Sequence, residues 1–224
     1  MRESGILMHI TSLPAPYGIG TMGKDAYAFV DFLVRAGQRY WQILPLTPTG
    51  YGDSPYQSLG ACAGNHYLID LDRLADEGLL KKEEIQDISW GSNPARVDFG
   101  AMYAHRMNVL RQAFQRFAPD EAYETFVEQN RSWLEDYALF TALKDTLGGK
   151  PWLDWPEALR LRKADALTEK RRELSDEIRL QYFVQYEFDR QWKALRSYAN
   201  AKGVRIIGDV PIYVPLDSAD VWAN

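Results

Sequence analysis

The sequence contains a single cysteine, Cys62, and only three histidines among 224 residues. One cysteine cannot form a disulfide within the chain, and a thiolate metal site needs several. The histidines, His9, His66 and His105, share no spacing that is typical of metal ligands. The sequence therefore predicts no metal site and no cofactor, and the near-absence of cysteine favours a reducing compartment such as the cytoplasm.

Long apolar runs and an excess of basic residues are also missing. No stretch approaches the roughly 20 apolar residues of a membrane span, and the N-terminal MRESGILMHITSLP lacks the cleavage site of a signal peptide. The net charge of -5 and the pI near 5.3 argue against a nucleic-acid-binding surface. We therefore expect neither a membrane nor a nucleic acid as partner. With 46% hydrophobic and 25% charged residues, the composition is that of a globular chain.

Two short apolar runs flank a helical pattern near the N-terminus. The runs Gly5 to Ser12 and Tyr40 to Leu46 are too short for helices, and prolines follow both. Between them, Lys24 to Ala36 carries apolar residues at helical spacing and is followed by Gly37. This order predicts an α/β fold in which two parallel strands are joined by a right-handed crossover. The glycines of PYGIG do not fit a dinucleotide-binding fingerprint, so a Rossmann fold is rejected.

From Leu71 to about Lys202 the strand-like runs disappear and helical periodicity takes over, which indicates a large helical insertion. The predicted helices cover Asp72 to Gly78, Phe99 to Phe117, Tyr123 to Leu147 and Ala166 to Ala201. Trp152 and Trp155 stand beside prolines in a turn whose expected role is packing.

A third apolar run, Val204 to Val214, holds Asp209 in its middle. A carboxylate inside a parallel strand must be paired, and functional side chains gather at strand ends in α/β barrels. Asp209 is thus a candidate site residue; the alternative is a buried acid that holds neighbouring backbone or an arginine. Three strands do not close a barrel, so we expect an incomplete chain. Its expected divisions are 1–70 (two strands, a helix and a loop), 71–202 (helical insertion) and 203–224 (third strand).

The loop after the second strand combines tyrosine, proline, glycine and polar residues. It presents Tyr51, Tyr56 and Tyr67 among Asp53, Ser54, Gln57 and Asn65. Aromatic rings stack on the apolar faces of sugars, and hydroxyls and amides bind sugar hydroxyl groups. The composition suits a sugar site, although an ordinary surface loop whose tyrosines pack inward remains the alternative.

Several motifs, in this order, resemble the amylomaltase or disproportionating-enzyme family of 4-α-glucanotransferases, relatives of the α-amylases. They are RYWQILPL, GYGDSPYQS, AGN-YLIDL, the pair Trp152 and Trp155, and RIIGDVPIYV followed by DSADVWA. The family fold is a (β/α)8 TIM barrel of roughly twice this length. The resemblance therefore implies the N-terminal part of such a barrel, with the helical insertion between its second and third strands.

The resemblance implies transfer of α-1,4-glucan segments between maltooligosaccharides by a retaining double displacement. By motif position, Tyr56 resembles the tyrosine that stacks on the sugar at the cleavage site, and Asp209 a substrate-side aspartate. Ser54 and Gln57 lie where donor hydroxyls are met, and Tyr51 and Tyr103 match a secondary glucan-binding groove. The nucleophile and the acid/base are expected beyond Asn224, so no catalytic residue is assigned in this chain.

Two other interpretations stay open. A non-catalytic module could bind α-glucans through the same tyrosine loop, and a purely structural fragment would bind no sugar. In the incomplete barrel that the resemblance implies, an open edge would expose apolar surface, which predicts self-association of the chain.

Overall fold

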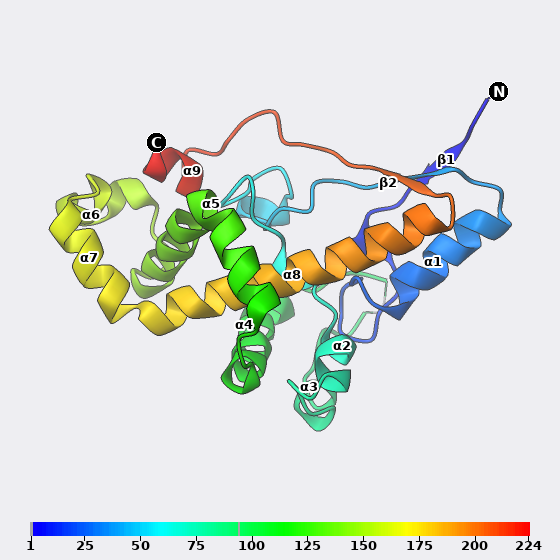
Figure 1. Ribbon diagram of the computed structural model, residues 1–224, viewed down its shortest axis with the longest axis horizontal. Coiled ribbons are helices and arrows are strands. Elements are labelled where there is room, and N and C mark those ends of the chain that lie inside the picture. The colour runs from blue at the N-terminus through cyan, green and yellow to red at the C-terminus, as the bar shows by residue number, and fades with distance from the viewer. Residues whose placement is uncertain (1, 94) are drawn as a thin grey trace. The chain divides into compact units, whose positions relative to one another are not determined.

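The computed structural model describes residues 2–93 and 95–224, apart from the side chain of Tyr51. The chain forms two compact units, each assembled from separate segments. The first unit comprises Met1–Pro45, Asn65–Ala118 and Glu187–Val210, and the second comprises Leu46–Gly64, Pro119–Tyr186 and Pro211–Asn224. Figure 1 labels the elements along the chain.

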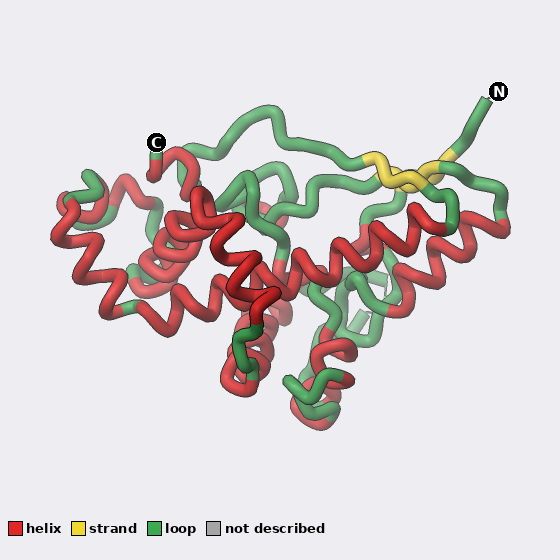
Figure 2. Tube along the Cα trace, in the orientation of Figure 1, coloured by secondary structure: helices red, strands yellow, loops and turns green. Residues whose placement is uncertain are grey.

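The strands of the described residues form one parallel sheet in the first unit, in the order β1-β2-β3 (Figure 2). The strands are β1 (Gly5–Leu7), β2 (Tyr40–Gln42) and β3 (Arg205–Ile207). Ile6, Trp41 and Ile206 stand in register across the three. Trp41 is fully buried, and its indole Nε1 donates a hydrogen bond to the Met8 carbonyl at 2.7 Å. The predicted parallel strands are thus confirmed.

Each strand is shorter than the sequence predicts. The apolar runs extend to Ser12, Leu46 and Val214, whereas the paired segments hold three residues each. After β1 the chain turns into the 3-10 helix η1 (Ile10–Ser12). Prolines follow the other two strands, Pro45 after β2 and Pro211 after β3, and proline has no N–H for sheet pairing. An apolar run marks a buried strand but does not fix where pairing ends.

Along the chain, helices lie between the three strands, and one of them packs against the sheet. The first unit holds α1 (Lys24–Arg35), η3 (His66–Leu68), α2 (Leu71–Asp76), α3 (Glu83–Gln86) and α4 (Phe99–Arg116). Helix α1 buries Val30 and Leu33, and the Phe29 ring lies 5.1 Å from that of Trp41. Asp70 and Asp98 cap α2 and α4 by accepting N–H bonds from Arg73 and Ala101. The predicted helices of this region are confirmed within two residues.

The second unit is built around an aromatic core. It holds η2 (Tyr51–Asp53), α5 (Glu121–Thr146), η4 (Trp152–Asp154), α6 (Glu157–Arg160), α7 (Ala164–Glu173) and α9 (Ala219–Ala223). The rings of Phe140, Trp155 and Trp222 lie 5.3 to 5.8 Å from one another. Trp152 is partly buried against the same core. The packing role predicted for Trp152 and Trp155 is therefore confirmed.

The long helix predicted from Ala166 to Ala201 is wrong in one respect. It is divided into α7 and α8 (Ser175–Ala201) at Leu174, whose backbone has φ -100° and ψ 22°. The Leu174 side chain is buried in the aromatic core together with Leu167 and Ile178. Burial of these three residues favours the bend over a straight continuation, which helical periodicity alone does not reveal.

Candidate functional site

The loop of residues 46–64 folds back on itself through backbone contacts. A Cβ atom on Gly50 would lie 1.9 Å from the carbonyl oxygen of Gln57, so only glycine allows this close approach. The Gln57 and Tyr56 N–H groups donate to the Ser54 carbonyl (3.2 Å) and hydroxyl (3.3 Å). The Thr47 hydroxyl donates to the Pro55 carbonyl at 2.9 Å. The motif GYGDSPYQS thus shapes a tight loop.

This loop presents predicted sugar-binding groups at its surface. Tyr56 is 41% exposed, Gln57 is exposed and Ser54 is partly exposed. Ser54, Tyr56 and Gln57 are therefore brought together on one loop, with a phenol ring, an amide and a hydroxyl within four residues. The side chain of Tyr51 lies outside the described residues.

The end of the loop is held by side chains that sequence reasoning missed. The buried Gln185 of α8 accepts the Gly64 N–H at 2.7 Å and donates to the Gly64 carbonyl at 3.0 Å. The Asp220 carboxylate accepts the Ala61 N–H at 2.9 Å. Both polar groups of Gly64 are thus satisfied by one side-chain amide. The available signal was a set of glutamines within the aromatic half of α8, since amides there must find buried partners.

Tyr103 belongs to the first unit, on the N-terminal part of α4. It is 58% exposed, and its ring meets that of Tyr67 edge to face at 6.1 Å. Tyr67 also lies 6.3 Å from Phe99. Tyr67, predicted as part of the tyrosine loop, is instead buried in η3, where its ring packs against the ring of Tyr103.

Arg106 fixes the backbone beneath this aromatic group. Its Nη2 donates to the carbonyls of Tyr67, at 2.8 Å, and Ile69. The side chain is fully buried, and desolvation lowers the pKa of Arg106 to about 10. At neutral pH the guanidinium therefore stays cationic. It lies 5.8 Å from the centre of the Trp90 ring, which offers a cation–π contact.

Asp209 follows the third strand, as predicted, but does not lie within a buried strand. Strand β3 ends at Ile207, and Asp209 is an exposed residue of the segment that follows. Its carboxylate accepts the Val210 N–H at 2.8 Å. Among the described residues, the Asp209 side chain is thus exposed and not enclosed by apolar groups. The alternative of a buried acid is therefore wrong for the described chain, and the role of Asp209 as a candidate site residue at the end of β3 stays a prediction.

The described residues contain neither a metal-binding cluster nor a membrane-spanning helix. No cluster of three or more His, Cys, Asp and Glu side chains is arranged to hold a metal ion. None of the described helices combines the length and apolar character needed to cross a membrane.

These features define a mixed α/β protein with a parallel sheet and an exposed tyrosine loop. A family model described as 4-alpha-glucanotransferase matches residues 8–224, and the chain belongs to that family. The 4-alpha-glucanotransferase of Thermus thermophilus is 51% identical over 229 residues, covering 100% of this chain and 45% of the relative. That of Clostridium butyricum is 48% identical over 219 residues, covering 97% and 45%. The resemblance read from the motifs is confirmed.

Solved structures give the same result. An amylomaltase from Streptococcus agalactiae in complex with acarbose superposes with a TM-score of 0.95 and 48% identity, covering 99% of this chain and 46% of that one. The amylomaltase of Corynebacterium glutamicum shares the fold at a TM-score of 0.74 but only 17% identity, and 32% of it is covered. The chain thus spans less than half the length of the relatives it matches.

Proposed function

We propose that this chain is the N-terminal part of a 4-α-glucanotransferase that transfers α-1,4-glucan segments between maltooligosaccharides. The observation that carries the proposal is the family match over residues 8–224 together with the compact, exposed GYGDSPYQS loop. The acarbose bound to the Streptococcus agalactiae relative supports a saccharide as ligand.

In the proposed parent protein, the three-stranded sheet is the first part of a (β/α)8 barrel. Residues 1–70 supply two strands and the substrate loop, 71–202 the helical insertion, and 203–224 the third strand and its loop. The parallel order β1-β2-β3 supports this assignment, since barrel strands are added in sequence order.

The sugar contacts are proposed residue by residue. Tyr56 stacks on a glucose ring at the cleavage site, and Ser54 and Gln57 bind donor hydroxyls from the same loop. Asp209 faces the substrate from the segment after β3, where exposure keeps its carboxylate accessible. Tyr51 and Tyr103 belong to a secondary glucan-binding groove.

The proposed chemistry is a retaining double displacement. It requires a carboxylate nucleophile and an acid/base about 5 Å apart, and a glycosyl-enzyme intermediate. We assign neither group to these 224 residues and expect both beyond Asn224. The reaction needs no metal or organic cofactor, because two carboxyl groups supply the nucleophile and the proton.

The chain alone is proposed to self-associate through its exposed sheet edge. In the first unit, Ile207 and Val210 are 44% and 78% exposed, and in the second unit Ile212 is 90% exposed. Exposed apolar side chains beside an unpaired edge strand promote association. We place the parent protein in the cytoplasm, with α-glucans as its partners.

Incubating the parent protein with maltotriose tests the proposal. Transfer should yield glucose together with maltotetraose and longer products, without added metal. Hydrolysis to glucose and maltose alone, or an absolute metal requirement, would contradict it.

A further inference from the structure

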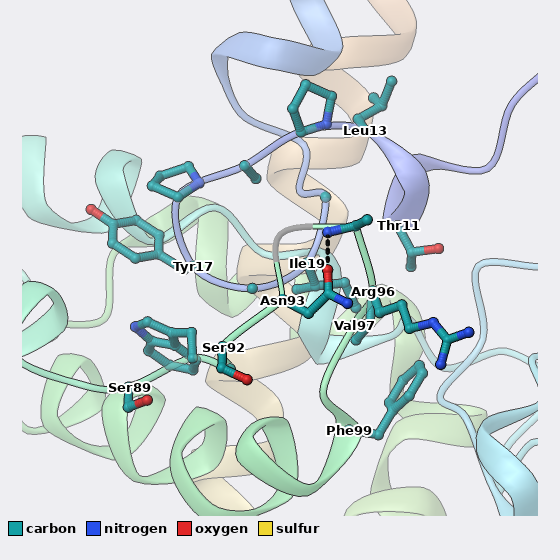
Figure 3. Close-up of a pocket in the computed structure, with 18 of the residues that line it drawn as sticks. Thr11, Leu13, Tyr17, Ile19, Ser89, Ser92, Asn93, Arg96, Val97 and Phe99 are labelled. Carbon is teal, nitrogen blue, oxygen red and sulfur yellow. Dashed lines mark hydrogen bonds between the residues drawn. The ribbon is translucent and has the colours of Figure 1, made fainter.

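A hollow lies within the first unit. Its volume is about 950 Å³, and its described lining residues come from the segments 11–20, 85–86, 88–93, 95–97 and Phe99 (Figure 3). Small-molecule sites are commonly about 300–1,000 Å³ in volume. Tyr103 and the loop 46–64 are not among its described lining residues, so the hollow is lined by a different set of residues from the contacts proposed above.

The two segments that line this hollow approach each other closely. A Cβ atom on Gly18, whose φ is +77°, would lie 2.4 Å from the Trp90 carbonyl oxygen, so glycine permits the walls to meet. The Trp90 indole donates to the Ile85 carbonyl at 3.0 Å and meets the Tyr17 ring at 6.2 Å. The Tyr17 hydroxyl in turn donates to Asp72 at 2.6 Å. The Trp90 and Tyr17 side chains are thus fixed by their hydrogen bonds and by the contact between their rings.

The described side chains that line the hollow are uncharged, with one cationic exception. Among the described lining residues there is no Asp or Glu, and Arg96 is the charged side chain. Ser89, Ser92 and Asn93 bring hydroxyl and amide groups, and Phe99 brings a partly exposed ring. Figure 3 shows Arg96 and Phe99 on the same wall as Asn93, whose Oδ1 accepts the Ala95 N–H at 2.9 Å.

We propose that this hollow is a further saccharide-binding site, taking a short neutral stretch of α-glucan. Phe99 would stack on a sugar ring while Arg96 and Asn93 bind its hydroxyls, the combination that sugars require. Among the described lining residues there is no carboxylate, which argues against a cationic ligand, and a single guanidinium would neutralise only part of the charge of a multiply charged anion. The choice of a glucan rests on the proposed function.

Hydrogen exchange of the full-length protein with and without the pseudo-tetrasaccharide acarbose tests this site. Peptides from 11–20 and 85–99 should become protected in the wild type and in Tyr56→Ala. Arg96→Ala should weaken the apparent affinity at these peptides about tenfold or more, since it removes a charged hydrogen-bond donor. Phe99→Ala is a second, independent variant.

Arg196→Ala on α8 and Phe32→Ala on α1 are matched controls, because both residues are exposed and lie outside the hollow. They should leave the protection unchanged. No protection in the wild type, protection lost in Tyr56→Ala, or protection intact in both Arg96→Ala and Phe99→Ala would each overturn the site. Maltotriose transfer is measured on the same wild-type sample. Protection without transfer would reject the proposed function alone, and transfer without protection would reject this site alone.

Discussion

The two compact units bury polar side chains of different kinds. Among the described residues, the buried polar side chains of the second unit are all uncharged: Thr47, Ser58, Gln181, Gln185 and Ser218. The first unit buries His9, Asp70, Arg106 and Glu187 as well as neutral groups. All three histidines of the chain also belong to the first unit. The comparison teaches that the buried polar groups of the second unit, Gln185 among them, make neutral hydrogen bonds, whereas the first unit also buries ionisable groups, whose protonation depends on pH.

The largest expected effect concerns the neutral hydrogen bonds. Gln185→Leu leaves the buried N–H and carbonyl of Gly64 without their amide partner. Each unsatisfied group costs about 1–3 kcal/mol, so the free energy of unfolding should fall by several kcal/mol. Urea titration measures it. Gln129→Leu, an exposed change on α5, is the control; an equal loss in both variants would contradict the anchoring role.

The second-largest effect is expected from acid, which should destabilise the first unit more than the second. Burial lowers the pKa of His9 from 6.5 to about 4. The unfolded chain then takes up the proton at higher pH than the folded chain. Stability is therefore full above pH 6.5 and is lost as the pH falls toward 4, by at most about 3 kcal/mol.

Hydrogen exchange at several pH values, corrected for intrinsic rates, locates this loss. Peptides from 1–45 should open more readily at pH 4.5 than at pH 7, while peptides from 119–186 change less. His9→Gln should reduce the difference but not remove it, because burial also lowers the pKa of His66 in the same unit, to about 3; the control His105→Gln should leave it unchanged. Equal acid sensitivity of the two units would contradict the claim that the first unit depends more strongly on pH.

Asp209→Asn keeps the shape of the side chain but removes its charge. Because Asp209 is exposed, stability should change little. In the parent protein kcat/KM for maltotriose should fall at least tenfold, which is about 1.4 kcal/mol. Unaltered kinetics would return Asp209 to a purely structural role.

The smallest effect is expected at Tyr56. Tyr56→Ala removes a ring that is proposed to stack on sugar, at a cost of about 0.5–1.5 kcal/mol of binding free energy. Calorimetry with maltoheptaose measures this loss. Tyr56→Phe retains the ring and should bind nearly as well as the parent; an affinity that depends only on the hydroxyl would contradict stacking.

Local patterns in the sequence predict the helices and the parallel strands well. Apolar spacing, the cap residues Asp70 and Asp98, and the glycines after α5 act within a few residues, so they can be read directly. The break at Leu174 depends on burial against distant residues, and the end of β3 depends on which strand lies beside it. Neither is encoded in local spacing.

The candidate site also combines features that local sequence predicts with features that depend on distant residues. The loop bearing Ser54, Tyr56 and Gln57 is recognisable because glycine, proline and tyrosine have local roles in it. The glutamines of α8 indicate buried amides but not their partners, since Gln185 lies 121 positions from Gly64. The hollow between residues 11–20 and 85–99 also combines distant segments, which no single motif announces.

The central claim is that these residues carry substrate contacts but not the catalytic carboxylates. It is tested most directly by giving the purified, mass-verified 224-residue chain maltoheptaose in a calorimeter and maltotriose in a transfer assay. The account predicts binding no tighter than about millimolar, roughly -4 kcal/mol, and no transfer product. Sustained transfer by the chain alone would show that the nucleophile and acid/base lie within it, and would contradict the account.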